Sequence, residues 1–235
     1  MATTLSITAA SASPTLLMPD LGMARFRQFS VDTTLISGRS LLRFTTVLIN
    51  IGDGPLQTHG YNLQPNGDMS VEQQIQDSLG GWTSYPTEYH MYYAGDLHSH
   101  WHLRDFESYV LQRNNGPDVR TGAKHGFCLQ DSYTFNLSLP GAPSSAHYLN
   151  CGNSSSTEVT TGISVGWGDK YAYKLRDQYI DITDLPSGQY TLTGTADALN
   201  SIAERCELNN TTKAVLQISG NSVTIVNQGG PSKRC

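Results

Sequence analysis

Three histidines at alternate positions are the densest chemical signal in this 235-residue chain. They stand in the run G-D-L-H-S-H-W-H-L-R-D-F-E-S-Y, at His98, His100 and His102. Alternate residues of a strand share one face, so the three imidazoles would point the same way. Imidazole suits zinc, copper, iron and nickel, and three neutral ligands leave positions open for chemistry. The spacing therefore predicts a catalytic metal site, with a solvated strand face carrying chance histidines as the alternative.

The same run limits how the three histidines can share one ion. A straight strand rises about 3.3 Å per residue, so the Cα atoms of His98 and His102 would lie roughly 13 Å apart. We therefore expect the segment to bend or bulge if all three side chains bind. Cu(II) has the highest affinity of the divalent first-row metals for such a nitrogen site. His100 and His102 with Glu107 are also close to the first half of a cupin metal motif, but no convincing second half follows.

The elements that would position these residues are predicted to be strands. Most apolar segments are short, rich in β-branched and aromatic residues, and bounded by Gly, Pro, Asn or Ser. The clearest expected strands cover residues 41–51, 132–139, 179–182 and 190–194. A hairpin is expected from residues 214–218 and 222–226, because Gly220 and Asn221 can take up positive φ in the turn between them.

One helix is predicted over residues 70–79. Ser70 and Gln73 form a capping box ahead of an apolar run, and Gly80 and Gly81 would end that run. The main part of the chain has no internal repeat and no break in composition. The sequence therefore predicts one all-β domain, an antiparallel β-sandwich with long irregular loops and one or two short helices.

Composition and charge exclude several classes of protein. Hydrophobic residues make up 38% of the chain and charged residues 15%, which is not the composition of a disordered or coiled-coil protein. A formal net charge of −5 without a basic run argues against a nucleic-acid partner. No apolar stretch approaches the roughly 18 residues that a membrane helix requires. We expect neither nucleic acid nor membrane among the partners.

The cysteines and sequons point to a secreted or extracellular protein. The four cysteines form no C-x-x-C pair, which disfavours a zinc ribbon, and their even number permits two disulfides. Triplets of the N-glycosylation type suit surface loops and begin at Asn136, Asn153, Asn209 and Asn210. The first residues show neither a basic n-region nor an apolar h-region. We expect that the signal peptide is not present in this chain, with a protein not exported by that route as the alternative.

Together with its flanks, the histidine run resembles the copper-binding segment of the lysyl oxidase family, a His-x-His-x-His run followed by an acidic and aromatic stretch. Further blocks follow in the family's order. They are L-L-R-F-T-T-V-L-I-N-I-G-D-G (41–54), A-K-H-G-F-C-L-Q-D-S (123–132), G-I-S-V-G-W-G-D-K-Y (162–171), Q-Y-I-D-I-T-D (178–184) and E-R-C-E-L-N-N (204–210). We divide the chain into a flexible N-terminal segment (1–14), a lysyl oxidase-like catalytic domain (15–228) and a loose C-terminal tail (229–235).

The resemblance implies a cofactor made from two of the chain's own side chains. In the family this group is lysine tyrosylquinone, and the positions matching its precursors are Lys124 and Tyr171. Copper near Tyr171 would favour the phenolate, and O₂ would oxidise the ring. Lys124 must then add to the ring as a free amine. An exposed lysine stays protonated at neutral pH, so we expect burial near Phe127, or the copper itself, to favour the neutral form.

The resemblance also bears on the cysteines. Cys128 and Cys151 match a disulfide pair of the family. Cys206 has no evident counterpart, and we pair it with Cys235, with a free thiol as the alternative. Where the animal enzymes carry further cysteines, this chain has Trp167 and Asp177. We therefore expect that two cross-links that brace the cofactor segment in the family are absent here.

The function that the resemblance implies is that of a copper- and quinone-dependent amine oxidase, of the protein-lysine 6-oxidase type. Its substrates would be molecular oxygen and a primary amine, either a small amine or a lysine-containing protein, and its products an aldehyde, ammonia and hydrogen peroxide. A general base must remove the α-proton, and the candidates are Asp131, Asp181 and Asp184. Two alternatives stay open. A cupin-like non-haem metal oxygenase would need the histidines and Glu107, and a non-catalytic secreted metal-binding β-sandwich would need the histidines alone.

Overall fold

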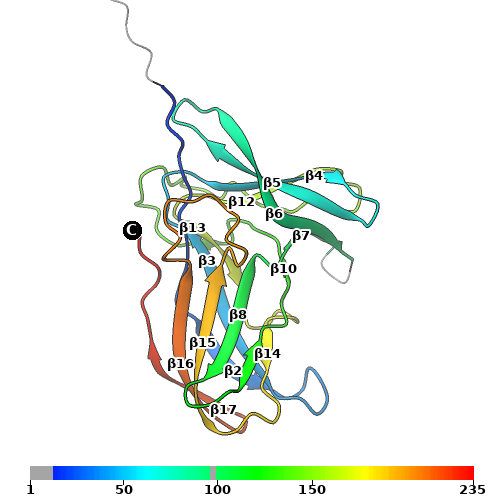
Figure 1. The fold of residues 1–235 in the computed structure, drawn as a ribbon, viewed down its shortest axis with the longest axis vertical. Coiled ribbons are helices and arrows are strands. Elements are labelled where there is room, and N and C mark those ends of the chain that lie inside the picture. Colours follow the sequence, from blue (N-terminus) through cyan, green and yellow to red (C-terminus); the bar gives the residue numbers. More distant parts are fainter. Residues whose placement is uncertain (1–12, 96–98) are drawn as a thin grey trace, which may run out of the picture.

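The computed structural model describes residues 13–95 and 99–235 and consists of strands, turns and loops (Figure 1). The described residues form no helix, which confirms the predicted all-β class but not the short helices expected with it. Accordingly, no helix in this part of the chain has the length and apolarity to cross a membrane. His98, one of the predicted metal ligands, lies outside the described residues.

The first of three antiparallel sheets is centred on β3 (Leu41–Asn50). Its other strands are β1 (Leu21–Met23), β2 (Arg27–Asp32), β11 (Tyr133–Thr134), β13 (Trp167–Tyr171) and β14 (Tyr179–Asp181). Every residue of β3 is buried, because the strand pairs along both edges and apolar clusters cover both faces. Phe44 and Leu48 enter the main cluster on one face, while Val47 and Ile49 enter a smaller cluster on the other, as the two-residue period requires.

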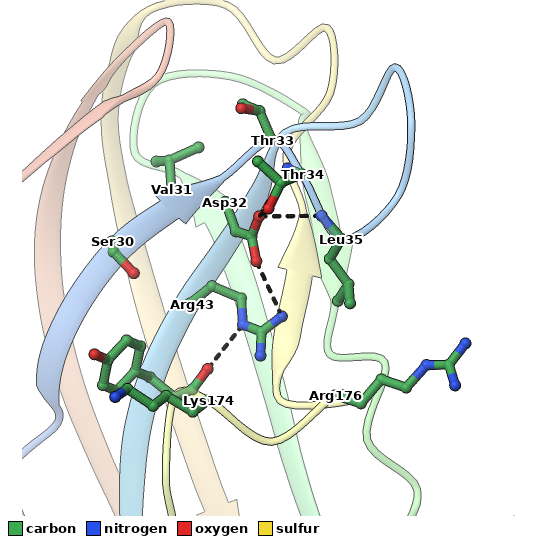
Figure 2. Close-up of a pocket in the computed structure, with 10 residues that line it drawn as sticks. Ser30, Val31, Asp32, Thr33, Thr34, Leu35, Arg43, Lys174 and Arg176 are labelled. Atoms are coloured by element: carbon green, nitrogen blue, oxygen red, sulfur yellow. Dashed lines mark hydrogen bonds and ion pairs between the residues drawn. The ribbon is translucent and has the colours of Figure 1, made fainter.

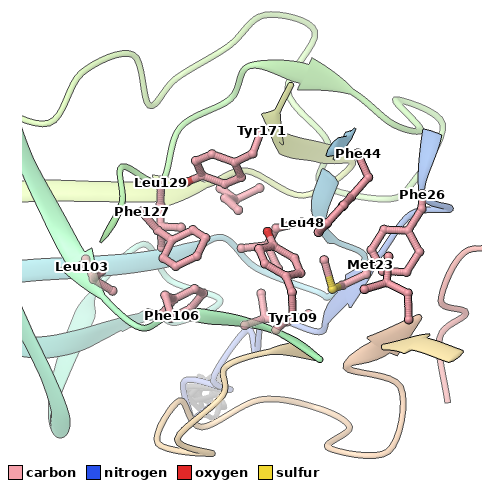
Figure 3. Packing of buried hydrophobic residues seen from close by; sticks show 14 of the residues in the cluster. Met23, Phe26, Phe44, Leu48, Leu103, Phe106, Tyr109, Phe127, Leu129 and Tyr171 are labelled. Carbon is pink, nitrogen blue, oxygen red and sulfur yellow. The ribbon is translucent and has the colours of Figure 1, made fainter. Parts of the chain in front are cut away.

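A second sheet packs face to face on the first and completes the sandwich. In spatial order it contains β17 (Ser222–Gln228), β16 (Thr211–Ser219), β15 (Gly188–Ala196), β8 (Glu107–Arg113) and β9 (Val119–Thr121). Figure 3 shows the shared core, in which Phe44 of β3 meets Tyr109 of β8 edge to face, with ring centroids 5.3 Å apart. Phe26 adds another edge-to-face contact with Phe44 at 5.6 Å.

The third sheet lies across one end of this sandwich, at the top of Figure 1. Its strands are, in spatial order, β10 (Gly126–Phe127), β7 (His100–Arg104), β6 (Trp82–Ala94), β5 (Asp68–Gln76), β4 (Leu56–Leu63) and β12 (Val159–Ile163). Met69, Met91 and Leu103 of this sheet belong to the same buried cluster as the sandwich core. One continuous core therefore fixes the third sheet against the sandwich.

The helix predicted over residues 70–79 is wrong. This segment forms most of β5, a strand between β4 and β6 whose buried residues alternate strictly with half-buried ones. Val71 and Ile75 are spaced for a helix face, but they are equally spaced for one face of a strand, and Gln73 between them is buried as well. The side-chain amide of Gln73 exchanges two hydrogen bonds, both of 2.8 Å, with the main chain of Ala203. Gln73, which the sequence analysis assigned to a helix cap, therefore forms tertiary hydrogen bonds from within a strand.

The other predicted elements are close to the observed ones. The hairpin is confirmed as β16 and β17, and Gly220 in its turn has a φ of 55°. Three of the four single strands are found as β3, β14 and β15. The segment 132–139 is paired only over β11, because Asn136 leaves the strand by accepting hydrogen bonds from the main chain and hydroxyl of Ser138.

Both expected disulfides are present, Cys128 with Cys151 and Cys206 with Cys235. The second one ties down the C-terminal tail, so the expectation of a loose end there is wrong. Ser232 also exchanges two hydrogen bonds with the main chain of β1, through its own main chain and its hydroxyl. The tail forms no strand, yet it is fixed along the edge of the sandwich.

The shared core predicts a large difference between two substitutions. Phe44→Ala removes a fully buried ring at the centre of the sandwich, and we expect it to lower the free energy of unfolding by about 3–5 kcal/mol. Ile225→Ala changes a side chain of β17 that is 50% exposed and should cost under about 1 kcal/mol. Urea unfolding of both variants tests this, and equal losses would contradict the assigned core.

Candidate active site

Strands of different sheets bring His100, His102 and the two predicted cofactor residues to one place. β7 carries His100 and His102 and pairs with β10. Lys124 lies just before β10, while Tyr171 ends β13 in the first sheet. Phe127 of β10 meets Tyr171 edge to face, with ring centroids 5.2 Å apart (Figure 3). The site therefore forms where the third sheet meets the sandwich.

The two described histidines of the run face each other. Nε2 of His100 and Nε2 of His102 are 2.8 Å apart, as expected for side chains that leave one strand on the same face. The ring of Tyr92 packs against His102, and Gly126 permits this packing, because a Cβ there would lie 2.4 Å from Nδ1 of His102. The imidazole pair can share a proton or present both nitrogens to one metal ion, which binds such nitrogens at about 2.0–2.1 Å.

Lys124 and Tyr171 are close neighbours in the fold, although they come from separate blocks of the sequence. The Nζ atom of Lys124 lies 4.8 Å from the centroid of the Tyr171 ring and 5.3 Å from that of Phe127. The Lys124 side chain is only 2% exposed, and its Nζ donates a hydrogen bond of 3.0 Å to Oδ2 of Asp177. A buried amine thus sits beside a buried phenol, with a carboxylate on its other side.

These groups share one cavity of about 160 Å³. Its lining combines imidazole, amine, phenol and carboxyl groups, contributed by His100, His102, Lys124, Cys128, Gln130, Asp169, Lys170, Tyr171 and Leu175. Convergent polar groups in a concave and partly apolar site are typical of a binding or catalytic centre. Both described histidines and both predicted cofactor residues are therefore members of one site.

Asp169 is the site carboxyl that the sequence analysis missed. It precedes Tyr171 by two residues on β13, so both side chains lie on one face, and it accepts a hydrogen bond from the Tyr171 hydroxyl. Burial raises the pKa of Asp169 to about 7, although hydrogen bonds from Tyr171 and Ser132 oppose the rise. Burial and the Asp169 charge raise the pKa of Tyr171 well above its ordinary value. The two-residue spacing before Tyr171 was the signal that could have identified Asp169.

The three aspartates considered as general base lie elsewhere. Asp131 is buried and accepts hydrogen bonds from the hydroxyl and main chain of Ser164, at 2.7 and 2.8 Å, so it ties loops together. Asp181 forms an ion pair of 3.3 Å with Arg39 near the surface, and Asp184 is exposed in a turn. None of the three lines the cavity that holds Lys124 and Tyr171.

The disulfide between Cys128 and Cys151 fixes one wall of the cavity to the histidine strand. Cys128 lines the cavity, and its carbonyl accepts a hydrogen bond of 3.3 Å from the Tyr171 hydroxyl. The carbonyl of Cys151 accepts a hydrogen bond of 2.9 Å from the main chain of Trp101, which stands between the two histidines of β7. This disulfide therefore connects the cofactor segment with the histidine pair.

A larger surface cavity of about 590 Å³ lies behind the loop that follows β13, and it contains none of the candidate residues (Figure 2). Arg43 at its base forms an ion pair with Asp32 at 3.6 Å. The same guanidinium donates to the carbonyls of Tyr173 and Leu175, at 2.8 and 2.5 Å. Arg43 thus fixes the loop whose Leu175 lines the candidate site.

Comparison with known families agrees with this geometry. The lysyl oxidase family model matches residues 72–228, more than half of the chain, a range that includes the histidine run, Lys124 and Tyr171. This chain belongs to the lysyl oxidase family. The family is one of copper amine oxidases, and membership rests on the whole matched region rather than on one motif.

The lysyl oxidase relatives are distant and much longer. The chain is 27% identical over 185 residues to lysyl oxidase homolog 2A of Danio rerio, covering 78% of this chain and 20% of the relative. It is 31% identical over 200 residues to lysyl oxidase homolog 2 of Gallus gallus, covering 84% of this chain and 21% of the relative. With lysyl oxidase homolog 3 of Homo sapiens it is 30% identical over 139 residues, covering 59% and 17%. The chain thus spans about a fifth of the length of these relatives.

A second buried carboxyl, Glu107 at the start of β8, predicts a pH-dependent stability. Burial raises the pKa of Glu107 from 4.5 to about 8, although the Tyr109 hydroxyl donates a hydrogen bond to it. The folded chain therefore keeps a proton that the unfolded chain releases, and the free energy of unfolding should fall as the pH rises from 4.5 through about 8. Glu107→Gln should flatten this fall by on the order of a few kcal/mol.

Urea unfolding of the copper-free protein between about pH 5 and 9 measures this effect. Glu88→Gln, at an exposed position, is the control and should keep the wild-type slope. An unchanged slope in Glu107→Gln would show that Glu107 is already ionised in the folded chain.

Proposed function

We propose that this chain is a copper-dependent amine oxidase whose cofactor, lysine tyrosylquinone, is made from Lys124 and Tyr171. The observation that carries the proposal is the position of the Lys124 Nζ atom, 4.8 Å from the Tyr171 ring centroid in the cavity that His100 and His102 also line. Packing alone would not require the histidine pair to line the same cavity as the buried lysine and tyrosine. The three groups together serve the oxidation of the ring and its linkage to the amine.

The donor set suits copper. Imidazole nitrogens are preferred ligands of this metal, and His98, His100 and His102 are the residues that would hold it. Copper would supply redox chemistry next to a phenol that burial otherwise keeps protonated. The paired Nε2 atoms of His100 and His102 support this assignment, since two ligands of one ion must converge in this way.

The proposed roles of the remaining residues follow from their contacts. Asp169 accepts the hydrogen bond of the Tyr171 hydroxyl and has a pKa of about 7, so it can take up a proton at neutral pH and release it again. Such a value is what general acid and base chemistry requires near neutral pH. We therefore assign the proton transfers at this site to Asp169 rather than to Asp131, Asp181 or Asp184. Phe127 and Leu175 provide the apolar walls that keep water from the amine.

The proposed substrate is a primary amine on a flexible alkyl chain. The cavity of about 160 Å³ has room for a short alkyl chain such as a lysine side chain or a small amine. The products would be the aldehyde, ammonia and hydrogen peroxide, with molecular oxygen as the second substrate. Two disulfides support a place outside the reducing cytosol, as expected for a secreted protein.

The cupin-like oxygenase is less well supported by the geometry. Glu107, the carboxylate that such a site would need, accepts a hydrogen bond of 2.7 Å from Tyr109 and is absent from the lining of the histidine cavity. A metal-binding sandwich without catalysis would not require Lys124 to lie against the Tyr171 ring, so it is also less well supported.

The function is tested by removing the amine. In Lys124→Ala we expect amine turnover and hydrogen peroxide release to fall to background, and phenylhydrazine to give no hydrazone band, because no quinone carbonyl forms. Copper content should stay at the wild-type level, since lysine is not among the proposed ligands. Lys213→Ala, an exposed lysine on β16, is the control and should behave like wild type. Undiminished turnover in Lys124→Ala would contradict the lysine tyrosylquinone assignment.

The metal site is tested separately by copper titration. His102→Ala should weaken copper binding by at least about tenfold, because it removes one of the two converging imidazoles. His90→Ala changes an exposed histidine of β6 and should leave the affinity unchanged. Equal affinities of the two variants would place the metal elsewhere.

A further inference from the structure

The loop over residues 172–178 follows β13 directly and closes one side of the cofactor cavity. Leu175 lines the cavity, while Arg43 holds the loop from the opposite side through its hydrogen bonds to the Tyr173 and Leu175 carbonyls. Near the end of the loop, Asp177 turns toward Lys124. The loop is therefore fixed at both ends by charged side chains.

The ion pair between Lys124 and Asp177 joins a fully covered group with a partly exposed one. The lysine side chain is 2% exposed and the aspartate side chain 35%, with Nζ and Oδ2 separated by 3.0 Å. Leaving one partner of a buried pair alone is strongly destabilising, so an ammonium at this depth depends on the carboxylate. The other oxygen of Asp177, Oδ1, is shielded from solvent and has no hydrogen-bond partner among the described residues. The ion pair therefore stabilises the buried Lys124 ammonium, while Asp177 loses the hydration of its second oxygen.

The contacts of the Lys124 amine determine where it lies relative to the Tyr171 ring. Asp177 holds Nζ from the loop, while the faces of the Tyr171 and Phe127 rings lie at 4.8 and 5.3 Å, within cation–π range. Asp169 also interacts electrostatically with Lys124, and it lies on β13, the strand that ends at Tyr171. Together these contacts seat the amine over the phenol instead of letting the long side chain reach solvent.

We infer that Asp177 is the positioning residue of the cofactor lysine: its carboxylate holds the Lys124 amine over the Tyr171 ring, where the two side chains must be joined. The inference rests on the proposed function. It also gives a role to the position at which the animal enzymes of the family carry a cysteine, because here an ion pair ties the loop to the lysine segment.

The test compares Asp177→Asn, which keeps the shape and removes the charge, with Asp177→Glu, which restores the charge. In copper-free protein, acetic anhydride should acetylate Lys124 about tenfold faster in Asp177→Asn than in wild type, because the unpaired amine leaves its seat. After loading with copper in air, the fraction of chains with linked Lys124 and Tyr171 peptides should fall about tenfold in Asp177→Asn. Asp177→Glu should recover most of both wild-type values.

The control is Asp118→Asn, which breaks a comparable ion pair with Arg113 on the far sheet and should change neither measurement. Thermal unfolding of the copper-free variants shows whether each one folds. Wild-type acetylation and cross-linking in folded Asp177→Asn would overturn the inference, as would failure of Asp177→Glu to differ from Asp177→Asn. If wild type itself forms no cross-link, the proposed function fails, and the acetylation rates alone then decide whether Asp177 seats Lys124.

Discussion

The rest of this structure depends on one constraint, the burial of a lysine amine at the junction of two sheets. A charged group with almost no exposure requires a partner, and the chain supplies Asp177 at 3.0 Å together with the faces of two aromatic rings. Placing these partners requires contributions from β10, β13 and the loop after β13. Such an arrangement lowers stability compared with an apolar core, which is typical of a residue retained for chemistry rather than for folding.

The sandwich and the third sheet act together as the scaffold for that amine. The aromatic core runs without a break from Phe26 and Phe44 to Tyr109, and Tyr171 and Phe127 belong to the same cluster (Figure 3). Tyr171 is therefore part of the core and of the cavity at once, because its hydroxyl donates a hydrogen bond to Asp169 while its ring face lies against the Lys124 amine. The disulfide at Cys128 and the buried Arg43 then fix the two walls of the cavity.

Much of the site could be predicted from local patterns, whereas its contacts could not. The alternation of His100 and His102 and the blocks around Lys124 and Tyr171 are visible in the chain. Asp177 was recognised only as a missing cysteine, because its contact with Lys124 joins segments that are far apart in sequence. The helix over residues 70–79 failed for a related reason. The four-residue spacing of Val71 and Ile75 fits one face of a helix and one face of a strand. Only the pairing of β5 with β4 and β6 decides between the two.

The central claim is that Lys124 and Tyr171 become one covalent cofactor. The most direct measurement is a peptide map by mass spectrometry of the wild-type protein after loading with copper in air. We expect a linked species that contains the peptide of Lys124 and the peptide of Tyr171, and we expect its loss when copper is withheld. Recovery of both peptides separate and unmodified from protein with bound copper would contradict it.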